Sequence, residues 1–336
     1  MRSRNVLATL ALLAIASSSA ATPPTIQHFT ATLSDLNLIT LEPEECFWRM
    51  LGNAEFDAAE MSLSSYLISM TDTGPGRFVA IPAFLSRSFR HGGIYVNQSS
   101  GIVDPEDLVG RTVGLAEYQL TANVWIRGLL AEHHGVPVAS VRYRTGGLHT
   151  PGRSEKMGIQ LPSDIDIAPI PRDRTLSDML AIGELDAVYS PRTPRCFQAG
   201  PSAVRRLFSD VRTVEADYYR RTGIFPIMHC VVLRRDVYEM NRWAARSLYR
   251  ALVAARDEAW RGMDETAALR FMVPWLVAEV ETTREILGND YWTYGLAGNE
   301  KALATLIGYS HSQGLARRAF APAELFAPET LEDTIV

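Results

Sequence analysis

The densest group of residues that could do chemistry lies in Phe84–Tyr95 (FLSRSFRHGGIY), where Arg87, Arg90 and His91 fall within five residues. Two guanidinium groups can each hold a carboxylate through paired hydrogen bonds. A neighbouring histidine titrates near neutral pH and could move a proton. A solvated basic turn would contain the same residues, but the apolar runs on both sides favour a position that enters a cleft.

A second segment, Phe56–Tyr66, places hydroxyl groups at the start of an expected helix. The end of an apolar strand is expected there, and the polar residues Glu60, Ser62 and Ser64 follow it. Hydroxyl groups and free backbone N–H groups at a helix start form a natural site for a carboxylate. From the spacing alone, a simple helix cap explains these serines equally well.

A third segment, Gly114–Arg127, contains another helix start at about Thr121, with Tyr118, Trp125 and Arg127 nearby. The two aromatic rings could stack on the ring of a ligand. Core packing is the alternative explanation for both rings.

Two further segments carry single candidates. Pro191 and Pro194 give the chain an irregular path after an expected strand, and Arg192 between them would face either a cleft or solvent. His229 stands alone among the apolar residues of Gly223–Cys230 (GIFPIMHC). That pattern is more typical of a core histidine than of a proton donor.

Motifs for other chemistries are missing from the sequence, which has no GxSxG elbow, P-loop, GxGxxG or HExxH. The three cysteines, Cys46, Cys196 and Cys230, are too scattered for a disulfide framework and lack zinc spacing. We therefore expect no cofactor, and no set of candidate ligands demands a divalent metal.

The elements that must position these residues alternate between short β-rich runs and helical patterns, which predicts an α/β fold. Thr112–Leu115 reads as a strand, Thr121–Glu132 as a helix and Leu185–Tyr189 as a strand, and Thr175 opens a helix through a capping box. From Tyr238 onward the pattern is mainly helical. The helices expected there are Asn241–Trp260, Thr266–Val280 interrupted by Pro274, and Asn299–Tyr309.

The composition is that of a globular protein. The 336 residues are 47% apolar and 21% charged, which excludes a disordered or collagen-like chain. A formal charge of -5 argues against a nucleic-acid partner. The length suits two lobes or one large domain.

The amino terminus has the three-part pattern of a secretory signal. Arg2 and Arg4 precede the apolar run Val6–Ala16, and small residues follow, with cleavage expected near Ser19–Ala21. The run is too short to span a bilayer, so we expect no stable membrane insertion after processing. The alternative is a retained first strand, so the location is cytoplasmic if the run is kept and exported if it is cleaved.

Several longer segments, matching in the same order from about Leu36 to the end, carry a resemblance to a known family. They are Phe47–Tyr66, Ala80–His91, Gly101–Leu130, Met179–Pro194, Gly223–Tyr238, Asp290–Asn299 and Ser312–Pro328. Together these segments resemble the 4,5-dihydroxyphthalate decarboxylase family.

This resemblance implies a fold similar to that of type II periplasmic solute-binding proteins. Two α/β lobes would enclose a ligand cleft, and the carboxyl-terminal part would be helical. Residues 22–105 plus 200–336 would form a discontinuous lobe I, and residues 106–199 would form lobe II. Residues 1–21 would be the signal peptide or an aberrant first strand.

The resemblance also implies the reaction, which converts 4,5-dihydroxyphthalate, or a close aromatic dicarboxylate, to protocatechuate and CO2 in phthalate degradation. Such a reaction needs an acid beside the ring carbon that loses its carboxylate. We expect His91 as that acid, with His229 or Glu60 as substitutes. The expected substrate-binding residues are Ser62, Ser64, Arg87, Arg90, Tyr118, Thr121, Trp125, Arg127 and Arg192.

The match departs from the family at the amino terminus. Spacing places the family's first strand near Leu10–Ala14, inside the signal-like run, unless Thr25–Thr32 replaces it. A true signal peptide favours an alternative function, a solute-binding protein that captures an aromatic acid for an ABC-type transporter. A binder of another small molecule, such as a pyrimidine precursor, is a third hypothesis with support from the fold alone. The sequence leaves homo-oligomerisation open.

Overall fold

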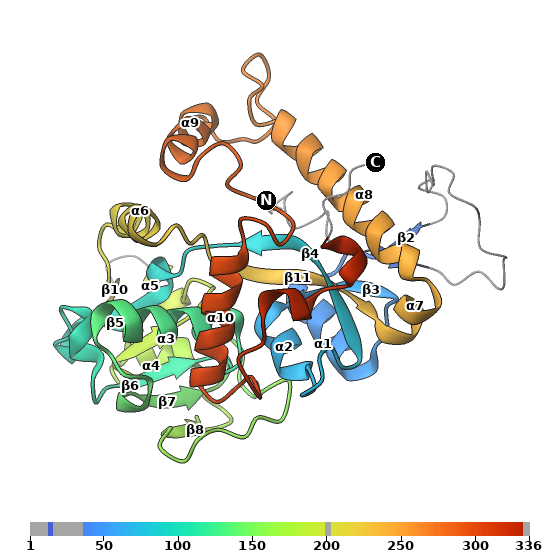
Figure 1. Ribbon diagram of the computed structural model, residues 1–336. Coiled ribbons are helices and arrows are strands. Elements are labelled where there is room, and N and C mark those ends of the chain that lie inside the picture. Colours follow the sequence, from blue (N-terminus) through green and yellow to red (C-terminus); the bar gives the residue numbers. More distant parts are fainter. Residues whose placement is uncertain (1–12, 16–35, 199–202, 332–336) are drawn as a thin grey trace.

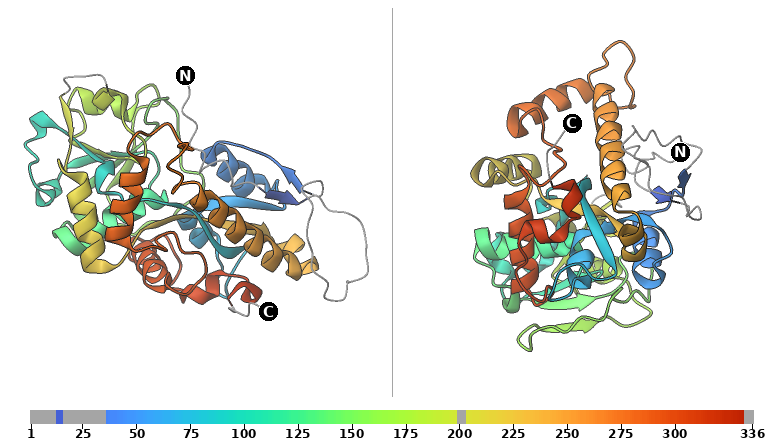
Figure 2. Two further views of the ribbon diagram at one scale, coloured as in Figure 1. Left: turned by 90° about the horizontal axis from the view of Figure 1, so that it is seen from above. Right: turned by 45° about the vertical axis from the view of Figure 1, so that its right-hand side comes forward.

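The computed structural model describes residues 13–15, 36–198 and 203–331. Two main β-sheets lie next to each other with helices packed around them, and a third sheet has only two short strands (Figures 1 and 2). The smaller sheet has the order β3–β11–β4, and its strands are all antiparallel. Its strands are β3 (Ala58–Ser62), β11 (Ile227–Arg234) and β4 (Phe78–Arg87).

The larger sheet has six strands in the order β10–β5–β9–β6–β7–β8. β6 pairs in parallel with β7 and β9, and β7 pairs in parallel with β8, whereas β5 pairs antiparallel with β9 and β10. The strands are β5 (Ile94–Asn97), β6 (Thr112–Leu115), β7 (Arg142–Thr145), β8 (Ile167–Pro169), β9 (Ala187–Tyr189) and β10 (Val204–Arg206).

The predicted α/β class with two lobes is confirmed. The smaller sheet with the helices on it is called lobe I below, and the larger sheet with its helices is called lobe II. The larger sheet extends beyond the expected range 106–199 on both sides, because β5 and β10 are hydrogen-bonded into it. The chain therefore passes between the sheets at residues 88–93 and again at residues 207–226.

The helices surround both sheets, and the carboxyl-terminal part is helical as expected. One helix was placed wrongly: residues 266–275 are not helical, and α9 begins only at Leu276, after Pro274. Proline lacks the backbone N–H and clashes with the preceding turn, so no helix runs across Pro274 and α9 begins just after it. The helices are α1 (Pro43–Asn53), α2 (Leu63–Ser69), α3 (Thr121–His134), α4 (Leu176–Ala181), α5 (Arg195–Gln198), α6 (Val211–Thr222), α7 (Arg235–Met240), α8 (Arg242–Arg261), α9 (Leu276–Leu287) and α10 (Glu300–Ser312).

Local signals explain several boundaries. The Thr175 side chain accepts a hydrogen bond from the Asp178 backbone N–H at 3.2 Å, which caps α4 as predicted. α3 ends at Gly135, whose φ of 63° is left-handed and favours glycine. In α8, Ala244, Leu248 and Leu252 recur every four residues and pack on the apolar face of the smaller sheet.

Helix α10 bridges the two lobes, because it packs against α2 of lobe I and α3 of lobe II (Figure 1). The Trp125 ring of α3 meets the Tyr309 ring of α10 edge-on at 5.6 Å. A Cβ added at Gly128 would lie only 2.0 Å from the Tyr309 ring. The lack of a side chain at Gly128 therefore permits the close approach of these two helices.

Part of the signal-like run is structured. Leu13–Ile15 form strand β1, which pairs antiparallel with β2 (Leu36–Leu38). The expected cleavage region Ser19–Ala21 and the alternative first strand Thr25–Thr32 lie outside the described residues. Among the helices described, none combines the length and the apolar character needed to cross a membrane.

Candidate active site

Glu60 and His229 form a hydrogen-bonded pair on one face of the smaller sheet. His229 of β11 lies directly opposite Ser62 of β3. Glu60 is two residues before Ser62, so its side chain points to the same face and lies diagonal to His229. Strand register thus brings the Nδ1 atom of His229 to 2.6 Å from Oε1 of Glu60.

This contact orients the imidazole ring. An ionised Glu60 carboxylate would accept a hydrogen bond from an Nδ1–H group of His229 and leave Nε2 for other partners. Glu60 is buried, whereas the His229 side chain is 20% exposed. His229 is thus a partly buried histidine whose Nδ1 is paired with a carboxylate, an arrangement open both to a structural role and to that of a proton donor held by a carboxylate.

Two helix starts meet beside this pair. Thr121 begins α3 in lobe II, and Ser62 caps α2 in lobe I. The Ser62 and Thr121 hydroxyl oxygens lie 2.8 Å apart, and the Ser64 backbone N–H donates to the Thr121 hydroxyl at 3.0 Å. The structure thus brings together three of the predicted binding residues, one of them from the other lobe.

This meeting has an electrostatic consequence. The start of a helix carries a partial positive charge, and here two starts face each other. The Ser64 hydroxyl is fully buried and has no hydrogen-bond partner within the described residues. Backbone dipoles and a free hydroxyl can together hold an anion, and His229 lies across the strand pair from Ser62.

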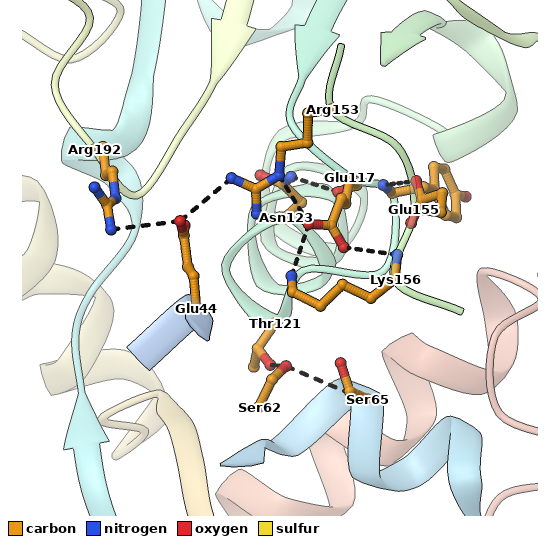
Figure 3. A network of polar contacts seen from close by, with 11 residues as sticks. Glu44, Ser62, Ser65, Glu117, Thr121, Asn123, Arg153, Glu155, Lys156 and Arg192 are labelled. Atoms are coloured by element: carbon orange, nitrogen blue, oxygen red, sulfur yellow. Dashed lines mark hydrogen bonds and ion pairs between the residues drawn. The ribbon is translucent and has the colours of Figure 1, made fainter. Parts of the chain in front are cut away.

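A network of charged residues lies beside α3, between the lobes (Figure 3). The Glu117 carboxylate is buried and accepts hydrogen bonds from Arg153 at 2.6 and 2.9 Å and from the Lys156 amine at 2.7 Å. Glu44 of lobe I pairs through its Oε2 atom with Arg153 at 3.4 Å and with Arg192 at 3.5 Å. The expected cleft residue Arg192 therefore faces a carboxylate across the lobe boundary.

The other predicted arginines have protein partners. Arg87 is buried and donates to the carbonyl oxygens of Phe225, at 3.1 Å, and Thr293, at 2.7 Å, and to the Asn299 side chain. Through its two Nη atoms it ties the chain after α9 to the end of β4. Arg90 donates through Nε to the Met228 sulfur at 3.0 Å, and burial lowers its pKa to about 10, so it stays charged at neutral pH.

Tyr118, Trp125 and Arg127 are buried, with exposures of 0%, 0% and 1%, and Trp125 lies where the two lobes meet. The Trp125 indole donates to the Ile227 carbonyl oxygen at 2.9 Å. The Arg127 guanidinium lies 3.7 Å from the Tyr118 ring centroid and donates to the Gln313 side chain at 2.9 Å. The burial of the two rings fits core packing, the alternative raised for them, and Arg127 is buried beside Tyr118.

His91, the expected acid, is buried in another environment. Its ring packs against Phe208 and Tyr218, with centroids 5.5 and 5.2 Å apart. Nδ1 has no hydrogen-bond partner within the described residues, and the Glu215 carboxylate is 4.0 Å away. Burial, aided by the neighbouring His134 and His133, lowers the pKa of His91 to about 4. A neutral imidazole at pH 7 is a poor general acid.

The same burial predicts a loss of stability in acid. The pKa of His91 is about 4 in the folded chain against an ordinary 6.5, so the unfolded chain binds the proton more tightly. The stabilisation is present above pH 6.5 and is lost as the pH falls towards 4, by on the order of 3 kcal/mol. Burial raises the pKa of the nearby Glu215 carboxyl, and this shift favours the folded chain as the pH falls, opposite to the effect of His91. Urea unfolding of His91→Gln should show a flatter dependence between pH 7 and 4.5 than the wild type, and parallel curves would contradict this account.

No three metal-ligating side chains (His, Cys, Asp or Glu) gather into a metal site within the described part of the chain. The polar groups around Ser62 and His229 are hydroxyls, one carboxylate and one imidazole, which suit the binding and protonation of an organic anion.

Comparison with known proteins identifies the family. Over 291 residues the chain is 38% identical to a 4,5-dihydroxyphthalate decarboxylase of Comamonas testosteroni, covering 87% of this chain and 88% of the relative. Over 179 residues it is 45% identical to a 4,5-dihydroxyphthalate decarboxylase of Pseudomonas putida, covering 53% of this chain and 69% of that protein. The chain belongs to the 4,5-dihydroxyphthalate decarboxylase family. The resemblance drawn from the sequence is thereby confirmed, although no family model matches the chain.

This member of the decarboxylase family is also similar to solved structures. The sulfonate-binding protein SsuA of Methylobacillus flagellatus has 14% identity and a TM-score of 0.49, over 84% of this chain and 76% of that chain. SsuA of Escherichia coli has 11% identity and a TM-score of 0.44, over 86% and 84% of the two chains. The desulfurization enzyme DSZB has 17% identity and a TM-score of 0.44, over 85% and 88%.

Sequence reasoning missed the network of Glu44, Glu117, Arg153 and Lys156. Arg153 and Lys156 lie three residues apart in a segment rich in glycine and proline, which read only as a loop. The sequence did contain one signal for this network: two basic residues lie close together in a loop between strand–helix units. Their buried carboxylate partner, Glu117, is 36 residues from Arg153 and could be found only from the fold.

Proposed function

We propose that this protein is a carboxy-lyase that converts 4,5-dihydroxyphthalate to protocatechuate and CO2. The activity named for the relatives supports this reaction class. The structural observation that carries the proposal is the Glu60–His229 pair, 2.6 Å apart and opposite the helix cap Ser62. It supplies a proton donor next to a place where a carboxylate can be held.

In this mechanism, the leaving carboxylate binds at the two facing helix starts, where Ser62, Ser64 and Thr121 position it. A rigid anion site holds the adjacent ring carbon against His229 and lowers the entropic cost of reaching the transition state. The acid role thus passes from His91 to His229, because His91 is buried and neutral at pH 7.

The protonated His229 ring donates the hydrogen on Nε2 to the ring carbon that bears the leaving carboxylate. The hydroxyl group para to that carbon supplies electron density as the new C–H bond forms. The C–C bond then breaks, its electron pair restores the aromatic ring, and CO2 leaves. Glu60 stabilises the charged imidazole before the transfer. After the transfer, a proton from water restores the charged form of the His229 imidazole.

The test is to incubate the purified protein with 4,5-dihydroxyphthalate and to follow CO2 and protocatechuate by gas analysis and liquid chromatography. Stoichiometric formation of both products supports the proposal. Tight binding of the substrate without turnover would contradict it and would favour the solute-binding function.

A further inference from the structure

A pocket of about 390 Å³ is lined by residues of both lobes, and its walls carry both acidic and basic side chains. α1 contributes Glu44, Glu45 and Trp48, and lobe II contributes Arg153 together with Glu117 and Lys156, which are paired with each other. Arg192 is outside the lining and contacts the group through Glu44. Glu44 and Trp48 are four residues apart, so they lie on the same face of the helix. The volume is within the usual range for small-molecule sites.

The contacts of Arg153 differ sharply in strength. Its bonds to the buried Glu117, at 2.6 and 2.9 Å, have the lengths of strong charge-assisted hydrogen bonds. Its contact with Glu44 is 3.4 Å, and the contact of Arg192 with the same Glu44 oxygen is 3.5 Å. Glu117 therefore fixes the position of Arg153, whereas Glu44 is held loosely by two cations.

Glu44 and Arg192 are also the accessible members of the group, with side-chain exposures of 36% and 55%. Exposed ion pairs contribute little to stability, so an incoming carboxylate can replace Glu44 at small cost. Trp48 is 56% exposed, and a tryptophan ring left in solvent beside two arginines is suited to stack on an aromatic anion.

We propose that Glu44, Trp48, Arg153 and Arg192 form a capture site for the aromatic substrate. A substrate carboxylate displaces Glu44 from the two arginines, and the Trp48 ring covers the aromatic ring. Glu44 acts as an internal competitor that occupies the site until the substrate arrives. This inference rests on the proposed function for the choice of an aromatic dicarboxylate.

The competing explanation is that Glu44 is only a latch that holds the lobes together. The two explanations predict opposite effects of Glu44→Gln on the binding affinity. If Glu44 competes with the substrate, Glu44→Gln strengthens binding and Arg192→Gln weakens it. If Glu44 is a latch, either change opens the lobes and both weaken binding.

The experiment measures the affinity for phthalate, a dianion without the ring hydroxyls that the reaction needs, by calorimetry on the full chain. We expect Glu44→Gln to bind about two- to fivefold more tightly, and Arg192→Gln and Trp48→Ala to bind about two- to fivefold more weakly. The control is Glu279→Gln, which removes an exposed pair with Arg212 elsewhere and should leave affinity unchanged.

A shift of Glu44→Gln and Arg192→Gln in the same direction, or no shift, would overturn the capture site. An unchanged phthalate affinity in Trp48→Ala would show that the Trp48 ring does not contact the aromatic ring of the ligand. Turnover of 4,5-dihydroxyphthalate is measured separately. Opposite shifts in phthalate affinity without turnover by the wild type would refute the proposed function and support the capture site.

Discussion

Replacing His229 with glutamine should lower kcat for 4,5-dihydroxyphthalate by about 10² to 10⁴, the usual contribution of a general acid. Glutamine keeps a polar group of similar size next to Glu60, 2.6 Å from the present imidazole, but it cannot transfer a proton at neutral pH. KM should change little, because the anion site at Ser62 and Thr121 is intact. Protocatechuate formation measured by liquid chromatography gives both constants.

The matched control is His311→Gln on α10, an exposed histidine outside the proposed site, which should keep wild-type turnover. Glu60→Gln should give an intermediate loss, since it keeps a hydrogen bond to the ring but removes the charge that stabilises the imidazolium. If His229→Gln retained more than half of the wild-type kcat while His91→Gln lost it, the acid role would return to His91.

Replacing Glu117 with alanine should lower the free energy of unfolding by about 3–5 kcal/mol, the usual cost of breaking a buried ion pair from one side. The Glu117 and Lys156 side chains are only 1% and 4% exposed, so the lysine would be left as a buried charge without its partner. The midpoint of urea unfolding at constant pH measures the loss.

A compensating variant separates charge from packing. In Glu117→Leu combined with Lys156→Met, both buried charges are replaced by apolar groups of similar volume, and most of the stability should return. Recovery of less than half of the loss would mean that the hydrogen bonds of Glu117, and not its charge balance, hold this segment. Glu279→Gln again supplies an exposed pair whose loss should be nearly neutral.

Local signals predicted much of the fold. The strand Thr112–Leu115 and the helix start at Thr121 agree with the structure, and the Thr175 cap forms as expected. Each of these depends on residues within one or two turns of each other, where the chain's own hydrogen bonding decides the outcome. Of the helix expected over Thr266–Val280, only the part after Pro274 is helical, because a helix cannot run through the proline without losing a hydrogen bond and meeting a steric clash.

The candidate site was predicted less well, because its contacts join distant parts of the chain. Glu60 and His229 are separated by 169 residues, and only the register of two antiparallel strands places them together. Arginine is a residue type that often binds carboxylates, but Arg87 donates hydrogen bonds to the carbonyl oxygens of Phe225 and Thr293. Residue type indicates what a side chain can bind, whereas tertiary structure decides which partner it meets.

The bridge made by α10 has a consequence for the order in which the chain can fold. Arg127 of lobe II depends on Gln313, 186 residues later, for the acceptor of its buried Nε–H. A ribosome must therefore complete nearly the whole chain before lobe II can satisfy this group. Contacts of such long range slow folding, and domains that depend on late segments cannot fold independently during synthesis. Lobe II, although continuous in its sheet, should fold together with lobe I and not before it.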